Sequence, residues 1–425
     1  MIQKQNNTGT TTKVPELLAP AGNMEKLITA IHYGADAVYL GGSNYSLRAG
    51  AGNFTLQKMT EATSYAHERG VKIYVTLNIF AHNHDLSKFK DHLRSLEETG
   101  VDGLIVADPG ILLLCKETLP QMPTHLSTHT NITNTQSVRF WASQGVQRVN
   151  LARELSLEEI REIRKETATE LEVFVHGALC ISYSGRCMLS NYLTGRDSNQ
   201  GACAHPCRYS YALVEEKRPG IYFPVEEDDR GTYIFNSRDL CLLNRLPELM
   251  TAGVDAIKIE GRMKSMGYVG ATVRVYRAAL NYIQEQLNQG AEINKITLPD
   301  TFQQEINKIG TRGQTENFFN ESPSSDAMLY DTIRINQQYS PVGIVRKSMP
   351  LLIEARNVLS TGDQIEYLGR ELEPITCTAV SMQTVDGKPK ERANPGDRII
   401  LTTSPALERP ATNAILRKNF GPTTS

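Results

Sequence analysis

The chain has 425 residues, of which 40% are hydrophobic and 22% are charged. This composition is typical of a folded globular protein and excludes a disordered or collagen-like chain. The 45 Lys and Arg residues nearly balance the 47 Asp and Glu residues, and the formal net charge is −2. No chain-wide basic field therefore indicates a nucleic-acid partner, and such a partner would have to meet a local patch.

The beginning of the chain shows no targeting signal. Residues 1–13 are polar and rich in Thr and Asn, without the apolar centre of a secretory signal, so we expect a disordered tail. The longest apolar run, Ile111–Cys115, is far shorter than the ~20 residues that a membrane-spanning helix needs. We therefore expect a cytoplasmic protein with no membrane partner.

Residues 14–290 alternate short β-branched runs with helix-length amphipathic segments, which is typical of parallel β/α units. The predicted strands are Leu17–Ala21, Ala37–Gly41, Val71–Asn78, Gly103–Asp108, His125–Thr128, Arg148–Arg153, Leu171–Gly177 and Ala256–Arg262. Ser156 and Glu159 have capping-box spacing, and a helix with one apolar face starts near Gly267. Eight such units favour a (β/α)8 TIM-like barrel. A doubly wound sheet is the alternative, but no G-x-G-x-x-G follows the first strand.

The β/α spacing is interrupted once, at residues 178–255, which replace the usual helix and hold five of the seven cysteines. Because this insertion leaves the carboxyl end of strand seven, we expect it over the face where barrel enzymes carry their chemistry. Residues 291–330 are polar and are interpreted as a linker. In residues 331–410, short strands such as Val342–Arg346 and Ile399–Thr402 alternate with Gly-Asp turns, which predicts a small β-barrel.

Four cysteines, Cys180, Cys187, Cys203 and Cys207, lie close together, separated by six, fifteen and three residues. A chain of this size does not need disulfides, so the cluster favours a metal centre in a reducing compartment. Four thiolates suit a [4Fe–4S] cluster or zinc. Only one pair has the C-x(2–4)-C spacing of structural zinc, so we favour [4Fe–4S] over zinc. Unrelated buried thiols are a third alternative, and we expect Cys115, Cys241 and Cys377 to be structural.

The run EVFVHGALCISYSGRCMLS, residues 172–190, resembles the signature of the collagenase-like peptidase family, peptidase family U32. Segments Leu17–Gly22, Ala35–Gly41, Asn236–Leu240 and Ile257–Arg262 resemble the family as well. Within it, residues 199–208 and 231–237 are similar to the branch that makes 5-hydroxyuridine at the tRNA wobble position. The resemblance implies a tRNA hydroxylase with prephenate as hydroxyl donor and an iron–sulfur cluster on the four cysteines. A peptidase and a non-catalytic subunit or binding module are the alternatives.

Hydroxyl transfer from a dicarboxylate requires cations, and arginine binds carboxylates with two parallel hydrogen bonds. By strand alternation, Lys258, Glu260 and Arg262 share one face of strand eight, and we predict catalytic roles for them, with a structural ion-pair network as the alternative. The other predicted catalytic residues are His176 and Glu154. The predicted substrate-binding residues near strand ends are Arg48, Asn78, His129, Asn131 and Arg153. Helix capping is an equal alternative for Asn78, His129, Asn131, Glu154 and His176, and we expect Glu172 to brace the barrel.

A tRNA partner would need a local basic patch. The candidates are Lys258, Arg262, Lys264, Arg274 and Arg277, continued in the C-terminal domain by Arg346, Lys347, Lys388, Lys390 and Arg392. Single-stranded anticodon bases would stack on aromatic side chains. A solvated charged surface without a partner is the alternative interpretation. A partner subunit is a further possibility that the sequence leaves open.

Overall fold

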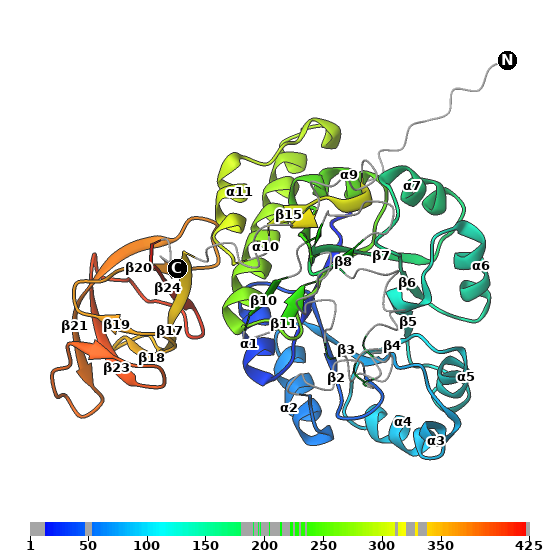
Figure 1. Cartoon of the computed structure of the whole chain (residues 1–425), viewed down its shortest axis with the longest axis horizontal. Helices are drawn as coiled ribbons and strands as arrows, with labels where there is room; N and C mark the ends of the chain where they lie inside the picture. The colour runs from blue at the N-terminus through cyan, green and yellow to red at the C-terminus, as the bar shows by residue number, and fades with distance from the viewer. Residues whose placement is uncertain are drawn as a thin grey trace.

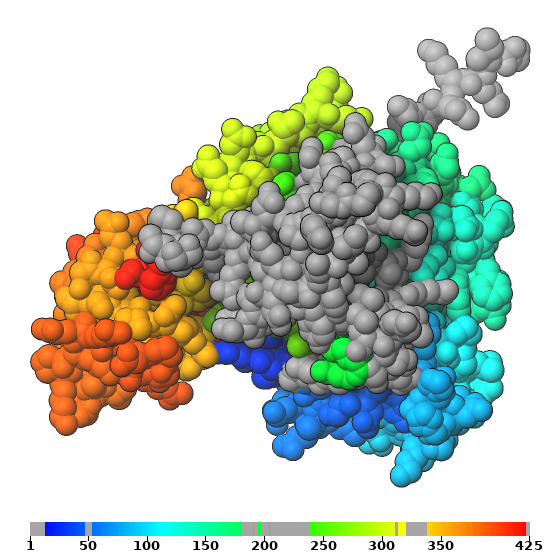
Figure 2. All heavy atoms as spheres, viewed as in Figure 1, coloured from blue at the N-terminus to red at the C-terminus, as the bar shows by residue number. Residues whose placement is uncertain are grey.

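The computed structural model describes most of both predicted domains. The described residues are 13–46, 53–179, 190, 194, 196, 204, 213–214, 222–223, 226–228, 231–233, 236–310, 313–319, 328–329 and 338–421. They form a large barrel of parallel strands surrounded by helices and a smaller barrel beside it (Figure 1). The smaller barrel forms a lobe that adjoins the large one (Figure 2). No helix in this part of the chain is long and apolar enough to cross a bilayer.

The large barrel closes because its last strand pairs in parallel with both the first and the seventh strands. Its strands, in barrel order, are β1 (Glu16–Pro20), β2 (Ala37–Gly41), β3 (Lys72–Leu77), β4 (Gly103–Val106), β5 (Thr124–Leu126), β6 (Arg148–Asn150), β7 (Glu170–Gly177) and β14 (Ala256–Ile259). These strands are almost completely buried because helices cover the outside and side chains fill the inside. The predicted (β/α)8 barrel is confirmed, and each predicted strand is present.

Helices cover the outside of the large barrel (Figure 1). They are α1 (Met24–His32), α2 (Leu56–His67), α3 (Asn83–Leu86), α4 (Phe89–Glu97), α5 (Pro109–Thr118), α6 (Thr135–Ser143), α7 (Leu157–Lys165), α9 (Leu246–Thr251) and α10 (Met266–Asn288). The predicted capping box of α7 is confirmed: Ser156 Oγ accepts from Glu159 N, and the Glu159 carboxylate accepts from Ser156 N at 2.7 Å. The predicted apolar face of α10 is buried, including Val269, Val273 and Tyr276.

Two predictions near the eighth strand are wrong. The insertion does not replace the last helix, because α9 precedes β14; α9 is short and mostly buried, so it shows no amphipathic period. Strand β14 ends at Ile259 rather than at Arg262. Its register with β7 shifts between Lys258 and Ile259, and Gly261 has a φ of +152°, which turns the chain out of the strand. Strand alternation therefore does not place Lys258, Glu260 and Arg262 on one face.

Short strands extend the sheet beside β7. Strand β13 (Asp239–Cys241) pairs antiparallel with β7, and β15 (Gln314–Thr315) pairs in parallel with β13. The remaining described pairs are β8 (Leu213–Val214) with β9 (Tyr222–Phe223), β10 (Glu226–Asp228) with β11 (Gly231–Tyr233), and β12 (Asn236–Ser237) with β16 (Met328–Leu329). The chain thus leaves the barrel at the carboxyl end of β7 and returns alongside the same strand.

The C-terminal domain is a closed antiparallel barrel. Its strands, in barrel order, are β17 (Tyr339–Lys347), β18 (Leu352–Ala355), β23 (Arg398–Ser404), β21 (Ile375–Thr384), β20 (Gln364–Leu368) and β24 (Ile415–Asn419), and a separate pair joins β19 (Leu359–Ser360) to β22 (Arg392–Ala393). Strand β24 lies beyond the predicted domain end at residue 410, so that boundary is wrong. The strand is short and its second half is polar, which gave no clear strand signal.

The predicted linker, residues 291–330, contains helix α11 (Asp300–Asn307), which packs against α10. Glu305 of α11 is buried and pairs with Arg274 of α10 and with Arg417 of β24. Tyr33, after α1, donates to the Leu368 carbonyl at 3.0 Å and accepts from Ile415 N at 2.9 Å. These buried contacts fix the C-terminal barrel against α1, α10 and α11 (Figure 1).

Candidate active site

Arg262 lies at the carboxyl-terminal mouth of the large barrel, in the loop after β14. Its Nη1 donates to Ser46 Oγ at 2.8 Å and to Thr76 Oγ1 at 2.9 Å, and its Nη2 donates to Asn53 Oδ1 at 3.4 Å. A Cβ atom on Gly41 would lie 2.5 Å from Arg262 Nη1, so only glycine leaves room for this guanidinium. The side chain is 3% exposed, and among the described residues hydroxyl and amide oxygens hold it in one orientation.

Glu260 reaches the same mouth from the loop that precedes Arg262. The Tyr39 hydroxyl, on β2, is 3.1 Å from both Glu260 Oε2 and the Ile259 carbonyl. The Tyr268 hydroxyl donates to the Glu260 carbonyl at 3.1 Å. The half-buried carboxylate is therefore positioned by Tyr39, and the backbone of its loop by Tyr268; neither tyrosine was predicted as a site residue.

Lys258 has different surroundings, inside the barrel. Its Nζ lies 2.8 Å from Glu172 Oε1, and the Arg148 guanidinium lies 3.6 Å from Glu172 Oε2 and 2.6 Å from Glu16 Oε1. Lys258, Glu172 and Arg148 are each at most 4% exposed. This is the ion-pair network that the sequence analysis held as the alternative for Lys258, and Glu172 braces the barrel as expected.

His176, near the end of β7, is fully buried. The Tyr276 hydroxyl donates to the Val175 carbonyl at 2.8 Å and lies 3.4 Å from His176 Nδ1. Because the phenol proton is directed to that carbonyl, we assign the ring proton to Nδ1, which leaves the lone pair on Nε2. Nε2 has no hydrogen-bond partner among the described residues. Burial lowers the pKa of His176 to about 4, so the ring is neutral at pH 7.

Asp239 of β13 also lies beside the end of β7 and is fully buried. Lys264 Nζ is 3.8 Å from Asp239 Oδ2 and 5.2 Å from the centre of the Tyr268 ring. The sequence analysis did not identify Asp239 as a site residue. It lies in the segment Asn236–Leu240, one of those that carry the family resemblance, and this was the available signal.

Several predicted residues lie at the same end of the barrel. Arg153, after β6, donates to the Ala178 carbonyl at 2.6 Å and stacks 4.0 Å from the centre of the Phe174 ring. Glu154 follows it, and its buried Oε2 has no hydrogen-bond partner within the described ranges. The others are Asn78, directly after β3, and His129 and Asn131, in the turn after β5. The structure therefore gathers these side chains around one mouth, and their roles stay predictions.

The cysteine cluster, Cys180, Cys187, Cys203 and Cys207, lies outside the described residues, as does Arg48. The other three cysteines are buried free thiols, and Cys115 and Cys377 lie in α5 and β21 as predicted. Burial raises the pKa of Cys115 to about 12 and that of Cys241 to about 11, so both are protonated and inert at pH 7. Within the described part of the chain, no group of three or more His, Cys, Asp or Glu side chains could hold a metal ion.

Three residues of the predicted tRNA-binding patch are not on the surface, so their assignment to the patch is wrong. Lys258 and Arg262 are each 3% exposed, and Arg274 is fully buried. Lys258 pairs with Glu172 and Arg274 with Glu305, while Arg262 is held by the hydroxyls at the mouth. Charges used inside the protein in this way cannot form a surface for RNA.

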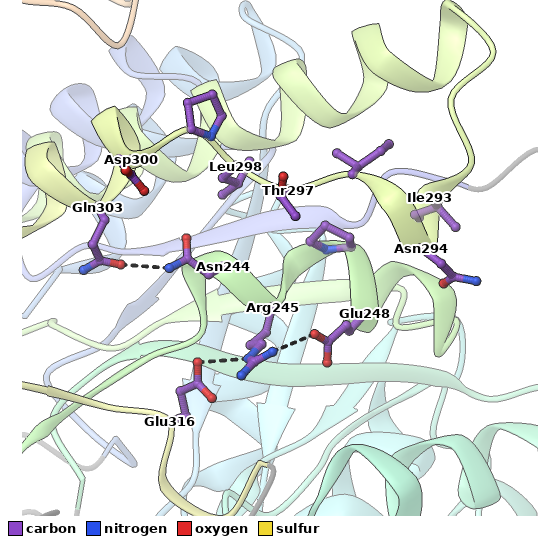
Figure 3. Close-up of a pocket in the computed structure, with 13 residues that line it drawn as sticks. Asn244, Arg245, Glu248, Ile293, Asn294, Thr297, Leu298, Asp300, Gln303 and Glu316 are labelled. Atoms are coloured by element: carbon purple, nitrogen blue, oxygen red, sulfur yellow. Dashed lines mark hydrogen bonds and ion pairs between the residues drawn. The ribbon is translucent and has the colours of Figure 1, made fainter.

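A cavity of about 410 Å³ lies outside the barrel, beside α9 and α11 (Figure 3). At its wall, Arg245 lies 2.8 Å from Glu248 Oε1 and 2.9 Å from Glu316 Oε1, and Asn244 donates to Gln303 Oε1 at 3.0 Å. The arginine is therefore neutralised by two carboxylates. This cavity lacks the oriented cation and the neutral base that the mouth provides.

The fold and the mouth define a (β/α)8-barrel protein with polar groups gathered at the carboxyl ends of its strands and with an added β-barrel. The chain belongs to peptidase family U32: the family model matches residues 22–329, and the model of the family's C-terminal domain matches residues 337–417.

Three relatives extend this comparison. The chain is 39% identical to tRNA hydroxylation protein P1 of Bacillus subtilis, over 90% of each chain. It is 35% identical to tRNA hydroxylation protein P of Escherichia coli, over 97% of this chain and 98% of that protein. It is also 37% identical to the 23S rRNA 5-hydroxycytidine C2501 synthase of Escherichia coli, over 72% of this chain and 45% of that protein.

Proposed function

We propose that this protein is an RNA-hydroxylating enzyme that converts the wobble uridine of tRNA to 5-hydroxyuridine, with prephenate as the hydroxyl donor. The observation that carries the proposal is the similarity to two relatives named for tRNA hydroxylation, at 39% and 35% identity over 90% and 97% of the chain. Similarity of this extent includes the barrel mouth and the C-terminal domain. The relative named for 5-hydroxycytidine synthesis supports hydroxylation of a pyrimidine at the same ring position.

The groups at the mouth suit this reaction. Arg262 presents an oriented guanidinium, and Arg153 lies at the same end of the barrel; both are suited to a dicarboxylate such as prephenate. Replacing the C5 hydrogen of uridine by a hydroxyl group is a two-electron oxidation: the hydrogen leaves as a proton, and the hydroxyl donor keeps the electron pair as its C–O bond breaks. His176 is neutral at pH 7 and carries a lone pair on Nε2, so it is our candidate for taking up that proton; its pKa of about 4 makes it a weak base, and the negative charge of a bound dicarboxylate would raise that pKa. Glu260, positioned by Tyr39, is a second candidate for holding a proton.

We propose that Cys180, Cys187, Cys203 and Cys207 hold a [4Fe–4S] cluster, which would act by electron transfer, by its charge or structurally, because four thiolates leave no iron with an open position. The described residues around these cysteines support the proposal. The segment starts and ends beside the mouth, after β7 and before β13. Buried Ser190, three residues after Cys187, accepts from the backbone N of Ala204, the residue after Cys203, at 2.9 Å. This hydrogen bond joins two parts of the chain that carry cysteines.

Nucleoside analysis of tRNA tests the reaction. The gene is expressed in a strain that lacks 5-hydroxyuridine and its derivatives but makes prephenate, and tRNA nucleosides are separated and identified by mass. We expect 5-hydroxyuridine with the wild-type chain and at least about a hundredfold less with His176→Gln, because general acid–base groups contribute about 10²–10⁴-fold. His32→Gln is the matched control: His32 is buried, with its pKa lowered to about 4, but it lies at the end of α1, away from the mouth. Absence of 5-hydroxyuridine with the wild-type chain would refute the proposed function.

Anaerobic purification tests the cofactor. We expect a brown protein with broad visible absorbance and about four iron atoms per chain. Cys203→Ser should remove the colour, whereas Cys377→Ala, in the C-terminal barrel, should keep it. Stoichiometric zinc in place of iron would reject the cluster.

A further inference from the structure

A cavity of about 370 Å³ lies between the two barrels. One side is formed by the loop after β14 and the start of α10, including Lys264 and Tyr268. The opposite side is formed by β17 and β24, including Tyr339 and Arg417, and Lys308 lies after α11. We call this cavity the interdomain cleft. Three basic residues and no Asp or Glu are among the described residues that line it.

This charge distribution distinguishes the interdomain cleft from the other two cavities. The cavity beside α9 has Arg245 among Glu248, Asp300 and Glu316. A third cavity, of about 610 Å³, is also lined by three basic residues, Arg69, Arg277 and Arg370, but it contains Asp36, which pairs with Arg277. A lining with cations and without carboxylates favours an anionic ligand.

Two cations that line the interdomain cleft, Lys308 and Arg417, form ion pairs with carboxylates. Lys308 Nζ is 2.7 Å from Glu305 Oε1, and Arg417 Nη2 is 2.6 Å from Glu366 Oε2 and 2.9 Å from Glu305 Oε2. With Arg274, three cations share two carboxylates, so this cluster has a net charge of +1. Arg274 and Arg417 are buried, so Lys308, with a quarter of its side chain exposed, presents this charge to the cleft.

Aromatic side chains lie beside these cations. The Tyr339 ring is 5.1 Å from both Lys308 Nζ and the Arg417 guanidinium carbon. Tyr339 is half-buried, so part of its surface faces the cleft. Cations together with an aromatic surface are the combination that binds single-stranded nucleic acid, through phosphates and stacked bases.

The interdomain cleft adjoins the barrel mouth through two shared residues. Lys264 and Tyr268 line the cleft, and the same two residues contact Asp239 and the Glu260 carbonyl at the mouth. The buried contacts of Tyr33 and Arg274 fix the two barrels relative to each other, which fixes the width of the cleft. A strand bound in the cleft would therefore lie next to the residues of the mouth.

We propose that the interdomain cleft binds the phosphodiester backbone of single-stranded RNA next to the nucleotide that enters the mouth. Lys308 contacts a phosphate, and Tyr339 supports a neighbouring base. The inference rests on the proposed function for the choice of RNA as the anion. It assigns RNA binding to the junction of the two barrels in place of the surface patch that the sequence predicted.

The test measures binding of a fluorescein-labelled RNA hairpin with a uridine-containing loop, by fluorescence anisotropy at several salt concentrations. Ser340→Glu puts a carboxylate into the cleft, and Ser340→Gln is its neutral control of similar size. Lys308→Gln removes a cation, and Lys308→Arg restores it. We expect Ser340→Glu and Lys308→Gln each to raise the Kd about tenfold, and Lys308→Gln to lower the salt slope by about 0.7, the value for one single-strand phosphate contact. The two control variants should bind like the wild type.

Lys90→Gln controls for loss of a lysine elsewhere, because Lys90 lies on α4, outside the cleft. The inference is overturned if the wild-type chain does not bind the hairpin, or if Ser340→Glu and Lys308→Gln bind it unchanged. A polyglutamate peptide that binds more tightly than the hairpin and responds to the same variants would overturn the assignment to RNA. If the wild-type chain hydroxylates tRNA but the cleft variants bind the hairpin as well as the wild type does, this inference is wrong and the proposed function stands. If the variants show the expected loss of hairpin binding but the wild-type chain does not hydroxylate tRNA, the proposed function is wrong and this inference stands.

Discussion

Buried ionisable side chains in the large barrel have two kinds of surroundings. Lys258 and Glu172 form an ion pair at 2.8 Å, and the Arg148 guanidinium lies on the other side of the carboxylate. His176 is instead kept neutral by burial, which lowers its pKa to about 4. A buried ion pair resists loss of either partner, whereas a buried neutral histidine resists protonation. The two kinds of group therefore respond differently to acid.

The shifted pKa of His176 predicts an acid-sensitive fold. In the unfolded chain the ring binds a proton as the pH falls below about 6.5, but in the folded protein it does so only near pH 4. The unfolded state therefore binds more protons between these values, and stability falls as the pH is lowered. We expect His176 to account for a loss of about 2 kcal/mol between pH 7 and pH 5. Urea unfolding of the wild type and of His176→Gln at both pH values measures this contribution.

His32→Gln is the comparison, because His32 is also buried with a pKa of about 4. Each single variant should lose part of the acid sensitivity, and the double variant should lose more. Acid sensitivity in His176→Gln equal to that of the wild type would show that His176 is not held neutral by the fold.

The partners of Arg262 show why the site was only partly predictable. Arg262 itself was predicted from its place at the carboxyl end of strand eight, although the strand ends earlier than expected. Its partners Ser46 and Thr76 come from the ends of β2 and β3, far away in the sequence. Serine and threonine are common in loops and strands, so nothing in their local pattern indicates that they position an arginine. Only the closure of the barrel brings them together.

Among the elements, the parallel strands were predictable because both of their faces are buried. AVYLG of β2 and GLIV of β4 are continuous apolar runs, which is the pattern of a strand inside a closed barrel. Elements with a mixed pattern were missed: α9 is too short to show a helical period, and β24 ends in polar residues. The local hydrophobic pattern therefore predicted the strands of the barrel. The short helix α9 and the last strand, β24, could not be predicted, because their positions are set by contacts with distant parts of the chain.

The capping box of α7 gives a prediction at this scale. Ser156→Ala removes the acceptor for Glu159 N and should lower the free energy of unfolding by about 1 kcal/mol. Ser156→Thr keeps the hydroxyl and should retain most of this stability. Chemical denaturation at pH 7 measures both variants. Equal stability of Ser156→Ala and the wild type would mean that water replaces the cap at no cost.

For the whole molecule, the junction between the barrels depends on buried charge. Arg274 is fully buried and donates to the carbonyls of Glu371 and Leu372, both at 2.7 Å, and to Glu305. Arg417 also pairs with Glu305 and is nearly buried. One carboxylate on α11 therefore links α10 of the large barrel to β24 of the small one. The helix in the predicted linker is what joins the two domains.

Glu305→Gln should uncouple the two barrels. The substitution keeps the shape of the side chain but leaves the Arg274 charge buried without its carboxylate, which costs about 3–5 kcal/mol in comparable buried pairs. We expect differential scanning calorimetry to show one transition for the wild type and two for the variant, with the C-terminal barrel unfolding separately. Glu292→Gln is the control, because Glu292 pairs with Lys295 in solvent, where an ion pair contributes little. A single, unshifted transition in Glu305→Gln would show that the apolar contacts and the Tyr33 hydrogen bonds suffice to hold the barrels together, and that the charge cluster only orients the cations of the interdomain cleft.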